Sequence, residues 1–367
     1  NIEGVSSLET LECTQTAITT LDVSQHPNLK TLDCGNNKAL QTLNIENANA
    51  LETLAFQQTS IEALDISAKA SLTVLNCSYT KIKALDVSQN KKLKELACGG
   101  NSALASLNVY GADALETLDC FGTGIKELDV TGNPLLTSLD FQGTRIETLD
   151  LSQNTNLITL SCQQTFLTKL DLSQNTALQS LYCQQTKLTG LDLSNNKQLT
   201  TLYCVYIPLA YLNLPTDTAL TSVDIPTEEA SITINVSGDT FNLNEAFPGI
   251  DSTKVNITSG ATAYDDGTGI VGGYVKGTPI QYTYDCGMDK NGNAKTLSAK
   301  LYLNMLEPSS ISITSTSDDL SKGYDGAAVT PSISKTGSTG AVTYTWKKKL
   351  NASTWEDLTT APIAVGT

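Results

Sequence analysis

The stretch LETLECTQTAITTLDVSQ, residues 8 to 25, contains most of one unit that this chain repeats many times. Leu8 and Leu11 lead into Cys13, which stands where a long aliphatic residue would be expected. Cysteine returns at the same slot in LKTLDCGNN, LKELACGGN and LQSLYCQQT further along the chain. One cysteine per unit at a fixed position serves either chemistry or packing, and the rest of the sequence bears on that choice.

The unit recurs every 21 or 22 residues up to about residue 227, so the chain is an internal repeat. Ten turns share one column, which reads Cys13, Cys34, Phe56, Cys77, Cys98, Cys120, Phe141, Cys162, Cys183 and Cys204. An eleventh, partial turn ends in Leu220, Val223 and Ile225. A single turn cannot bury its own apolar edge, so the period predicts a solenoid whose core forms only by stacking.

The first half of each unit is similar to the leucine-rich repeat, L-x-x-L-x-L-x-x-N-x-L, with cysteine in the third leucine slot. Alternation in TLECT predicts a short strand with Leu11 and Cys13 inward and Thr10 outward. We expect parallel strands on a concave face, and ten steps of about 4.8 Å predict an arc roughly 50 Å long. The expected fold class is an α/β-type or mostly β leucine-rich repeat solenoid.

Cysteine at this slot in turns of 21 residues resembles the bacterial internalins of the cysteine-ladder type, over residues 1 to about 227. The resemblance implies a surface-exposed protein whose repeats recognise a host protein or a glycan, followed by an immunoglobulin-like β-domain. It does not identify the partner. Internalin-type repeats usually carry asparagine three residues after the cysteine slot, whereas this chain mostly has threonine: Thr16, Thr59, Thr80, Thr123, Thr144, Thr165 and Thr186, against Asn37 and Asn101.

Composition excludes several classes of partner. The 367 residues contain 38 acidic and 23 basic side chains, a net charge of −15, which is the wrong sign for nucleic acid or an anionic membrane surface. No run approaches the roughly 18 apolar residues of a membrane span. The chain opens at Asn1 without a signal peptide, as expected of a mature or trimmed chain, and we expect a monomer.

Two observations favour packing over chemistry for the cysteine column. A disulfide needs β-carbons about 3.5 to 4.5 Å apart with converging vectors, whereas stacked parallel strands hold them near 4.8 Å and parallel. Phe56 and Phe141 occupy the same slot without any atom that could bind zinc. We therefore predict reduced, buried thiols and no metal or cofactor, with a redox or metal role as the alternative. Cys286 lies outside the column and has no evident partner.

A second column carries only aspartate and asparagine: Asp22, Asn44, Asp65, Asp86, Asn108, Asp129, Asp150, Asp171, Asp192 and Asn213. Both residue types offer an acceptor oxygen, which suits hydrogen bonding to backbone N–H groups of the following turn. The alternatives are a calcium-binding spine and a solvated face. The asparagines argue against calcium, because an amide side chain does not supply the negative charge that a calcium site takes from carboxylates.

Two further segments follow the repeats. Alternating SITINVS, KVNIT, IQYTYD and TLSAKLYLN predict an antiparallel, β-sandwich-like domain at 228–308 that covers the last repeat. In residues 309–367, GYDGAAVTP and WEDLTTAPIAVGT resemble part of an immunoglobulin-like module of bacterial surface proteins. No nucleophile is paired with the single histidine, His26, which we expect to be solvated in an outer loop, and GTGIVG at 267–272 is expected to be a glycine turn rather than a cofactor site.

The outward positions of the concave strands change in character along the chain. In turn order the central column reads Glu12, Asp33, Ala55, Asn76, Ala97, Asp119, Asp140, Ser161, Tyr182 and Tyr203. The predicted ligand-binding surface lies on the later turns and comprises Phe121, Gln142, Gln163, Tyr182, Gln184, Tyr203 and Tyr206. Exposed aromatics beside amides suit stacking on a sugar or anchoring a protein side chain. Alternatively, such pairs only stabilise neighbouring strands.

Taken with the resemblance, these features predict a bacterial cell-surface or secreted protein that adheres to a protein or glycan and has no catalytic activity. The alternative is a passive spacer in a larger surface protein, which would present bland outward positions. A hydrolase is less favoured, because it would require carboxylates that converge in a pocket.

Overall fold

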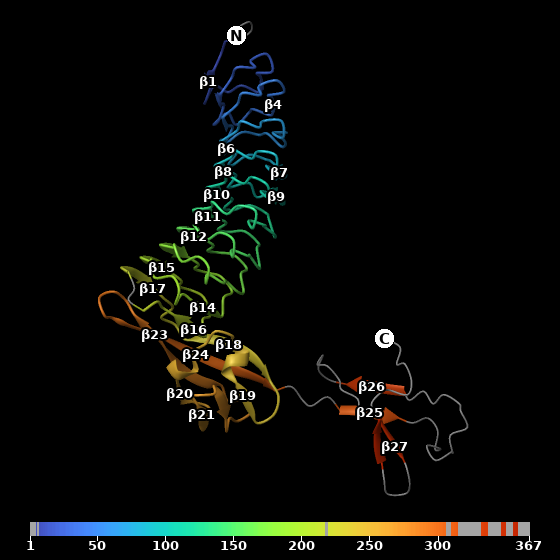
Figure 1. The fold of residues 1–367 in the computed structure, drawn as a ribbon, viewed down its shortest axis with the longest axis vertical. Coiled ribbons are helices and arrows are strands. Elements are labelled where there is room, and N and C mark those ends of the chain that lie inside the picture. Colours follow the sequence, from blue (N-terminus) through green and yellow to red (C-terminus); the bar gives the residue numbers. More distant parts are fainter. Residues whose placement is uncertain are drawn as a thin grey trace, which may run out of the picture.

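The computed structural model describes residues 5, 7–216, 219–305, 310–314, 332–336, 346–349 and 355–358. The repeat turns stack along an arc that begins at the N-terminus, and a β-module follows the last turn (Figure 1). Leucines of successive turns form one continuous core that also includes the buried side chains of this module. The predicted boundary near residue 227 lies between the last repeat strand and the first strand of the module.

One parallel sheet of eleven strands runs the length of the repeats. Its strands are β1 (Thr10–Glu12), β3 (Thr31–Asp33), β5 (Thr53–Ala55), β6 (Val74–Asn76), β8 (Glu95–Ala97), β10 (Thr117–Asp119), β11 (Ser138–Asp140), β12 (Thr159–Ser161), β13 (Ser180–Tyr182), β15 (Thr201–Tyr203) and β17 (Ser222–Asp224). Each central leucine or valine pairs in register with that of the next turn, as Leu139 does with Leu160. The sheet lies on the inner side of the arc (Figure 1), so the predicted parallel solenoid is confirmed.

The opposite half of each turn is mostly irregular, with three short parallel pairs. These pairs are β2 (Thr20–Asp22) with β4 (Thr42–Asn44), β7 (Ala84–Asp86) with β9 (Ser106–Asn108), and β14 (Gly190–Asp192) with β16 (Tyr211–Asn213). No turn contains a helix within the described residues, which selects the mostly β form of the two expected fold classes.

The cysteine column is buried in the core. Seven of its eight cysteines are buried, Phe56 and Phe141 fill the same slot, and none of the nine cysteines described forms a disulfide. Cys13 differs from the prediction because it is only partly buried. Its strand, β1, is the edge strand of the sheet and has a neighbouring turn on one side only. The column therefore behaves as packing, as predicted.

Burial sets the reactivity of these thiols and gives a testable expectation. Loss of hydration raises the pKa of Cys34 and Cys77 to about 12, and it raises the pKa of Cys13 in the same direction. At pH 8 a thiol with a pKa of 12 is about 10⁻⁴ thiolate, the form that alkylating reagents attack. We expect iodoacetamide to label Cys13 first in the folded protein and the other cysteines at least about a hundredfold more slowly.

Mass spectrometry of peptides labelled with and without urea measures this difference. Rapid labelling of several column thiols in the folded protein, or a disulfide between neighbours such as Cys162 and Cys183, would contradict the packing role.

The threonine and asparagine column forms a hydrogen-bond ladder. The Thr165 hydroxyl donates to the Cys162 carbonyl at 2.7 Å, and six other threonines repeat this bond three residues after their own slot. Asn101 spans two turns, since its Nδ2 donates to the carbonyls of Cys77 and Cys98. Each threonine hydroxyl therefore bonds within its own turn, whereas the asparagine amide also bonds to the preceding turn.

The aspartate and asparagine spine caps turns, as predicted. The Oδ1 of Asp150 accepts from the Ser152 N–H at 2.9 Å, and the same bond to residue i+2 occurs at nine of the ten positions. Asn44 and Asn108 make it as aspartate does. Asn213 is the exception, because the residue at i+2 is Pro215, which has no N–H, and its amide instead contacts the module beyond the repeats.

A further buried column was not predicted. The side chains of five asparagines are fully buried, and each Nδ2 donates to two backbone carbonyls of the preceding turn: Asn90, Asn133, Asn154, Asn175 and Asn196. His26 occupies the equivalent position in the first turn and is 2% exposed, so the expectation of a solvated histidine was wrong. The outer loop folds this position inward, where a polar side chain can bond loop carbonyls that stacking shields from water.

The module after the repeats contains two sheets. The four-stranded sheet has the order β18 (Ala230–Val236), β24 (Ala294–Met305), β23 (Ile280–Met288), β20 (Val255–Ser259), and the three-stranded sheet has the order β19 (Thr240–Asn242), β22 (Ile270–Gly272), β21 (Ala263–Asp265). The four predicted strands are present. The antiparallel prediction was wrong for one pair, because β18 and β24 run parallel. They are the first and last strands of the module, so no hairpin constrains their direction.

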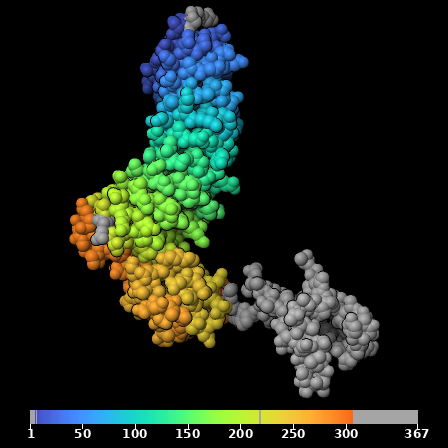
Figure 2. Space-filling model, in the orientation of Figure 1, coloured from blue at the N-terminus to red at the C-terminus, as the bar shows by residue number. Residues whose placement is uncertain are grey.

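This module covers the last repeat through specific polar contacts. The Tyr282 hydroxyl donates to the Ala210 carbonyl at 2.9 Å, and the Tyr284 hydroxyl donates to the Asn213 Oδ1. Cys286 is buried beside them, and its thiol donates to the Tyr284 carbonyl at 3.7 Å. Figure 2 shows the module packed directly against the later turns.

The remaining elements are short. They are α1 (Leu243–Ala246), the 3-10 turn η1 (Ser252–Lys254), and the antiparallel pairs β25 (Ser310–Thr314) with β26 (Ser332–Thr336) and β27 (Trp346–Lys349) with β28 (Trp355–Leu358). The residues at 267–269 form a turn between β21 and β22, as expected, whereas the rest of the predicted glycine turn, 270–272, is the strand β22. Most of the predicted immunoglobulin-like module at 309–367 lies outside the described residues.

Candidate functional site

The predicted binding residues lie on the outward side of the eleven-stranded sheet and just beyond its strand ends. Tyr182 and Tyr203 end β13 and β15, where they are register partners. The second outward column holds Phe121, Gln142, Gln163 and Gln184, two residues past the ends of β10, β11, β12 and β13. All of these side chains are partly exposed.

Tyr182 and Tyr203 form an aromatic stack. Their ring centroids lie 5.5 Å apart and their planes differ by 7°. The Ser222 hydroxyl on β17 donates to the Tyr203 hydroxyl at 3.2 Å. The stack therefore fixes both rings on the sheet at little further cost in side-chain entropy, which suits an anchor for a partner as well as a brace between strands.

The glutamines form a partial amide ladder beside this stack. The Nε2 of Gln163 donates to the Oε1 of Gln142 at 2.5 Å. No donor in the described part of the chain reaches the buried Oε1 of Gln163 or Gln184. Because both oxygens are buried, they offer no acceptor to a partner in this arrangement.

Phe121 belongs to a different cluster from the tyrosine stack. Its ring packs edge-on against Tyr79, with centroids 5.7 Å apart and planes at 67°. The ring also lies over Gly99, where an added Cβ would be 2.3 Å from the Phe121 Cδ1. Tyr79 was not among the predicted residues, although the paired glycines Gly99 and Gly100 in the turn between them were a sequence signal for close side-chain approach.

Tyr79 and Tyr206 share a third column in which the backbone is left-handed. Their φ values are 55° and 58°, and glutamine, asparagine or glycine occupies the same place in other turns. The Tyr79 N–H donates to the Gly99 carbonyl at 2.9 Å, so stacking holds this conformation. Tyr206 is 76% exposed and borders a cavity of about 610 Å³ at the end of the repeats, which Asp224 and Glu228 also line.

The sheet face carries negative charge and no positive charge. Asp119 and Asp140 are register partners at the ends of β10 and β11, and neither forms an ion pair within the described residues. Loss of hydration raises the pKa of both carboxyl groups, and the charge of Asp119 adds to the effect at Asp140. The bonds that Asp119 and Asp140 accept from the N–H groups of Phe121 and Gln142 oppose this shift.

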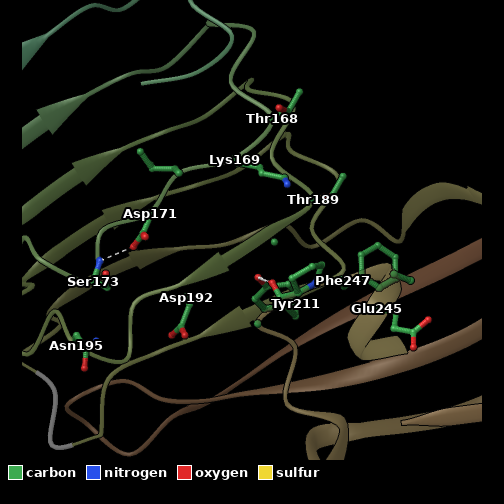
Figure 3. Close-up of a pocket in the computed structure, with 15 residues that line it drawn as sticks. Thr168, Lys169, Asp171, Ser173, Thr189, Asp192, Asn195, Tyr211, Glu245 and Phe247 are labelled. Atoms are coloured by element: carbon green, nitrogen blue, oxygen red, sulfur yellow. Dashed lines mark hydrogen bonds between the residues drawn. The ribbon is translucent and has the colours of Figure 1, made fainter. Parts of the chain in front are cut away.

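A separate cavity of about 510 Å³ lies between the outer side of the last turns and α1 (Figure 3). Lys169, Asp171, Asp192 and Glu245 border it, and Tyr211 forms part of its wall. The Tyr211 hydroxyl donates to the Pro248 carbonyl at 2.6 Å. The sequence could not indicate this cavity, because its lining comes from the repeats and from the module together.

Solved structures of similar shape are internalin-type and other leucine-rich repeat proteins. A functional domain of InlJ from Listeria monocytogenes, which includes a cysteine ladder, is 24% identical, with 83% of this chain and 87% of that chain covered and a TM-score of 0.46. YopM, a leucine-rich effector protein from Yersinia pestis, is 20% identical, with 60% and 57% covered and a TM-score of 0.41. Internalin C2 from Listeria monocytogenes is 15% identical, with 60% and 80% covered and a TM-score of 0.37.

No protein-family model and no curated protein sequence matches the chain. Because every TM-score quoted is below 0.5, the fold assignment rests on the strand register and burial of this chain. The described residues contain no helix suited to crossing a membrane. Nor do they group three or more histidine, cysteine or acidic side chains around a possible metal position.

Proposed function

We propose that the chain is a bacterial cell-surface or secreted binding protein that recognises a protein or glycan through its concave sheet face. The contact residues are those of the later turns, namely Phe121, Gln142, Gln163, Tyr182, Gln184, Tyr203 and Tyr206. The proposal includes no catalytic step, no cofactor and no membrane insertion, and it takes the protein to act as a monomer. The cell-surface location is supported by the cysteine slot and the repeat length, which resemble those of the internalins.

One observation carries this proposal: the stacked pair Tyr182 and Tyr203 on an outward, partly exposed sheet face. Aromatic residues that are rigid and partly exposed are enriched at the energetic centres of interfaces. The central column of the earlier turns, such as Ala55, Asn76 and Ala97, has no such pair, although it belongs to the same sheet. Packing of the repeats therefore does not require tyrosine at this column.

The same contacts also favour a second candidate, a passive spacer. Tyrosine stacking and the Gln142 to Gln163 hydrogen bond stabilise neighbouring strands whether or not a partner binds. Stability and binding must therefore be measured on the same variants.

Replacing both Tyr182 and Tyr203 by alanine separates the two candidates. We expect at least about a tenfold loss of affinity for a partner found by screening the protein on glycan and host-protein arrays, because interface anchors of this kind contribute most of the binding energy. Titration by biolayer interferometry measures the loss, and a urea titration reports stability.

A matched control removes two exposed tyrosines elsewhere. Tyr110 and Tyr302 are 59% and 44% exposed and lie off the eleven-stranded sheet, so Tyr110→Ala with Tyr302→Ala should leave the affinity unchanged. If the Tyr182→Ala, Tyr203→Ala protein binds as tightly as this control, the concave face is not the binding site.

A further inference from the structure

The central outward positions of four adjacent strands place unlike side chains in one line. Asp119 pairs with Asp140, Asp140 with Ser161, and Ser161 with Tyr182, across β10, β11, β12 and β13. Ser161 is the only small residue in this line. The sequence of side chains along the sheet is therefore carboxylate, carboxylate, hydroxymethyl, ring.

The small side chain of Ser161 leaves one face of the Tyr182 ring without an aromatic neighbour. Tyr203 stacks on the side of β15, whereas the register partner on the side of β12 is Ser161, which is too short to cover a phenol ring. Two strand spacings of about 4.8 Å separate the backbones that carry Asp140 and Tyr182, roughly 10 Å in all. A planar group that stacks about 3.5 to 4 Å from the ring can therefore also reach the carboxylate.

The charge around Ser161 favours a cation. Four positions of each turn face outward on this side: the first and last residues of the strand, the residue two positions past the strand, and the left-handed residue after it. These positions contain no lysine or arginine from Thr10 to Tyr206. The lysines nearest to the sheet in sequence, Lys30 and Lys94, are paired with Glu9 and Glu116 just before their strands begin.

We propose that the concave face binds a protein partner through an arginine side chain, whose guanidinium lies over Ser161 between the Asp140 carboxylate and the free face of Tyr182. This inference rests on the proposed function and names the chemistry of its partner. A guanidinium is planar, carries only donors, and both stacks on rings and pairs with carboxylates. A neutral sugar would donate hydrogen bonds but leave the negative charge of the carboxylates uncompensated, and an acidic glycan would be repelled by them.

The test uses a fluorescein-labelled hexa-arginine peptide as the probe, with fluorescence anisotropy in 0.15 M NaCl. Screening at this ionic strength acts over about 8 Å, which limits attraction from distant charges. We expect Asp119→Asn with Asp140→Asn to weaken binding at least about tenfold, because the partner charges are removed. Asparagine keeps the hydrogen bonds to Phe121 and Gln142.

The matched control changes the same charge in the same two turns. Asp129→Asn with Asp150→Asn alters the aspartate and asparagine spine, where Asn44 and Asn108 already make the same turn-capping bond. We expect less than about a twofold change in this control. Equal weakening by the two double variants would show general attraction to an acidic protein and overturn the inference.

A third variant blocks the site without altering charge. Ser161→Phe extends the aromatic stack by one strand at a position that resembles that of Tyr182, so the sheet should accept it. We expect hexa-arginine binding to fall by at least about tenfold, because the ring occupies the place of the guanidinium. Unchanged binding would overturn the proposed position, as would equal binding of a hexa-glutamate peptide to the unmodified protein.

The two proposals can fail separately. An array partner that is lost by Tyr182→Ala with Tyr203→Ala but retained by Asp119→Asn with Asp140→Asn would overturn only the arginine inference. A partner retained by both double variants would overturn the concave binding face itself.

Discussion

Replacing Asn196 by alanine is expected to lower the free energy of unfolding by about 1 to 3 kcal/mol. Its Nδ2 donates to the carbonyls of Leu172 and Asn175 at 3.1 and 2.9 Å, and the side chain is fully buried. Alanine would remove one of two donors from each carbonyl, because the Leu172 carbonyl also accepts from the Asn175 N–H and the Asn175 carbonyl from the Leu178 N–H. The net contribution of each lost hydrogen bond is about 0.5 to 1.5 kcal/mol.

The adjacent residue provides the control for this prediction. Asn195 is exposed, so Asn195→Ala should change stability by less than about 0.5 kcal/mol. Urea titration followed by far-UV circular dichroism measures both variants. Asn196→Asp should be at least as damaging as alanine, because it sets a carboxylate against two carbonyls. Equal stability of the two alanine variants would refute a structural role for the buried asparagine column.

The second large effect is expected in the cysteine column. Phe141 is fully buried in a slot that cysteine fills in the turns on either side, so Phe141→Ala removes a whole ring from the core. We expect a loss of about 3 to 5 kcal/mol, which is typical for such a cavity. Cys162→Ala, at the same slot one turn later, removes only a sulfur atom and should cost about 1 kcal/mol.

Comparison of the two variants by urea titration tests whether volume or chemistry governs this slot. If packing governs it, Phe141→Cys should fall between the two alanine variants, because cysteine restores part of the lost volume. If Cys162→Ala were as destabilising as Phe141→Ala, the thiols would have a role that volume does not explain.

The sequence contained enough information for the features that every turn repeats. The inward cysteine slot, the turn-capping oxygens of the spine and the parallel register each depend on residues within one turn and on contacts with its copies. Ten copies of one pattern therefore make the environment of Cys120 or Asp150 predictable without coordinates. The same reasoning located Tyr182 and Tyr203 on adjacent strands, because a fixed period fixes the register.

The sequence predicted less where a side chain contacts a residue other than the equivalent residue of a neighbouring turn. The buried asparagine column was missed because four of its positions hold His26, Ala48, Lys69 and Ala112, which hide the pattern. Lys69 is 2% exposed and satisfies its ammonium with the Glu46 carbonyl and the Asn49 Oδ1 at 2.8 and 2.9 Å. Different side chains can satisfy their polar groups at the same buried position through different hydrogen bonds. The residue type alone therefore does not show that the positions are equivalent.

The sequence by itself determined the parallel solenoid, because its period specifies which residues stack. Only the tertiary structure decided that Phe121 reaches Tyr79 across the space left by Gly99 and Gly100, since side-chain direction and the absence of Cβ atoms act between turns. It also decided that the Asn213 amide, which has no N–H to cap at Pro215, meets Gly249 and Tyr284 of the following module. Contacts between a repeat and a non-repeating segment follow no period, so they emerge only when both surfaces are folded and in place.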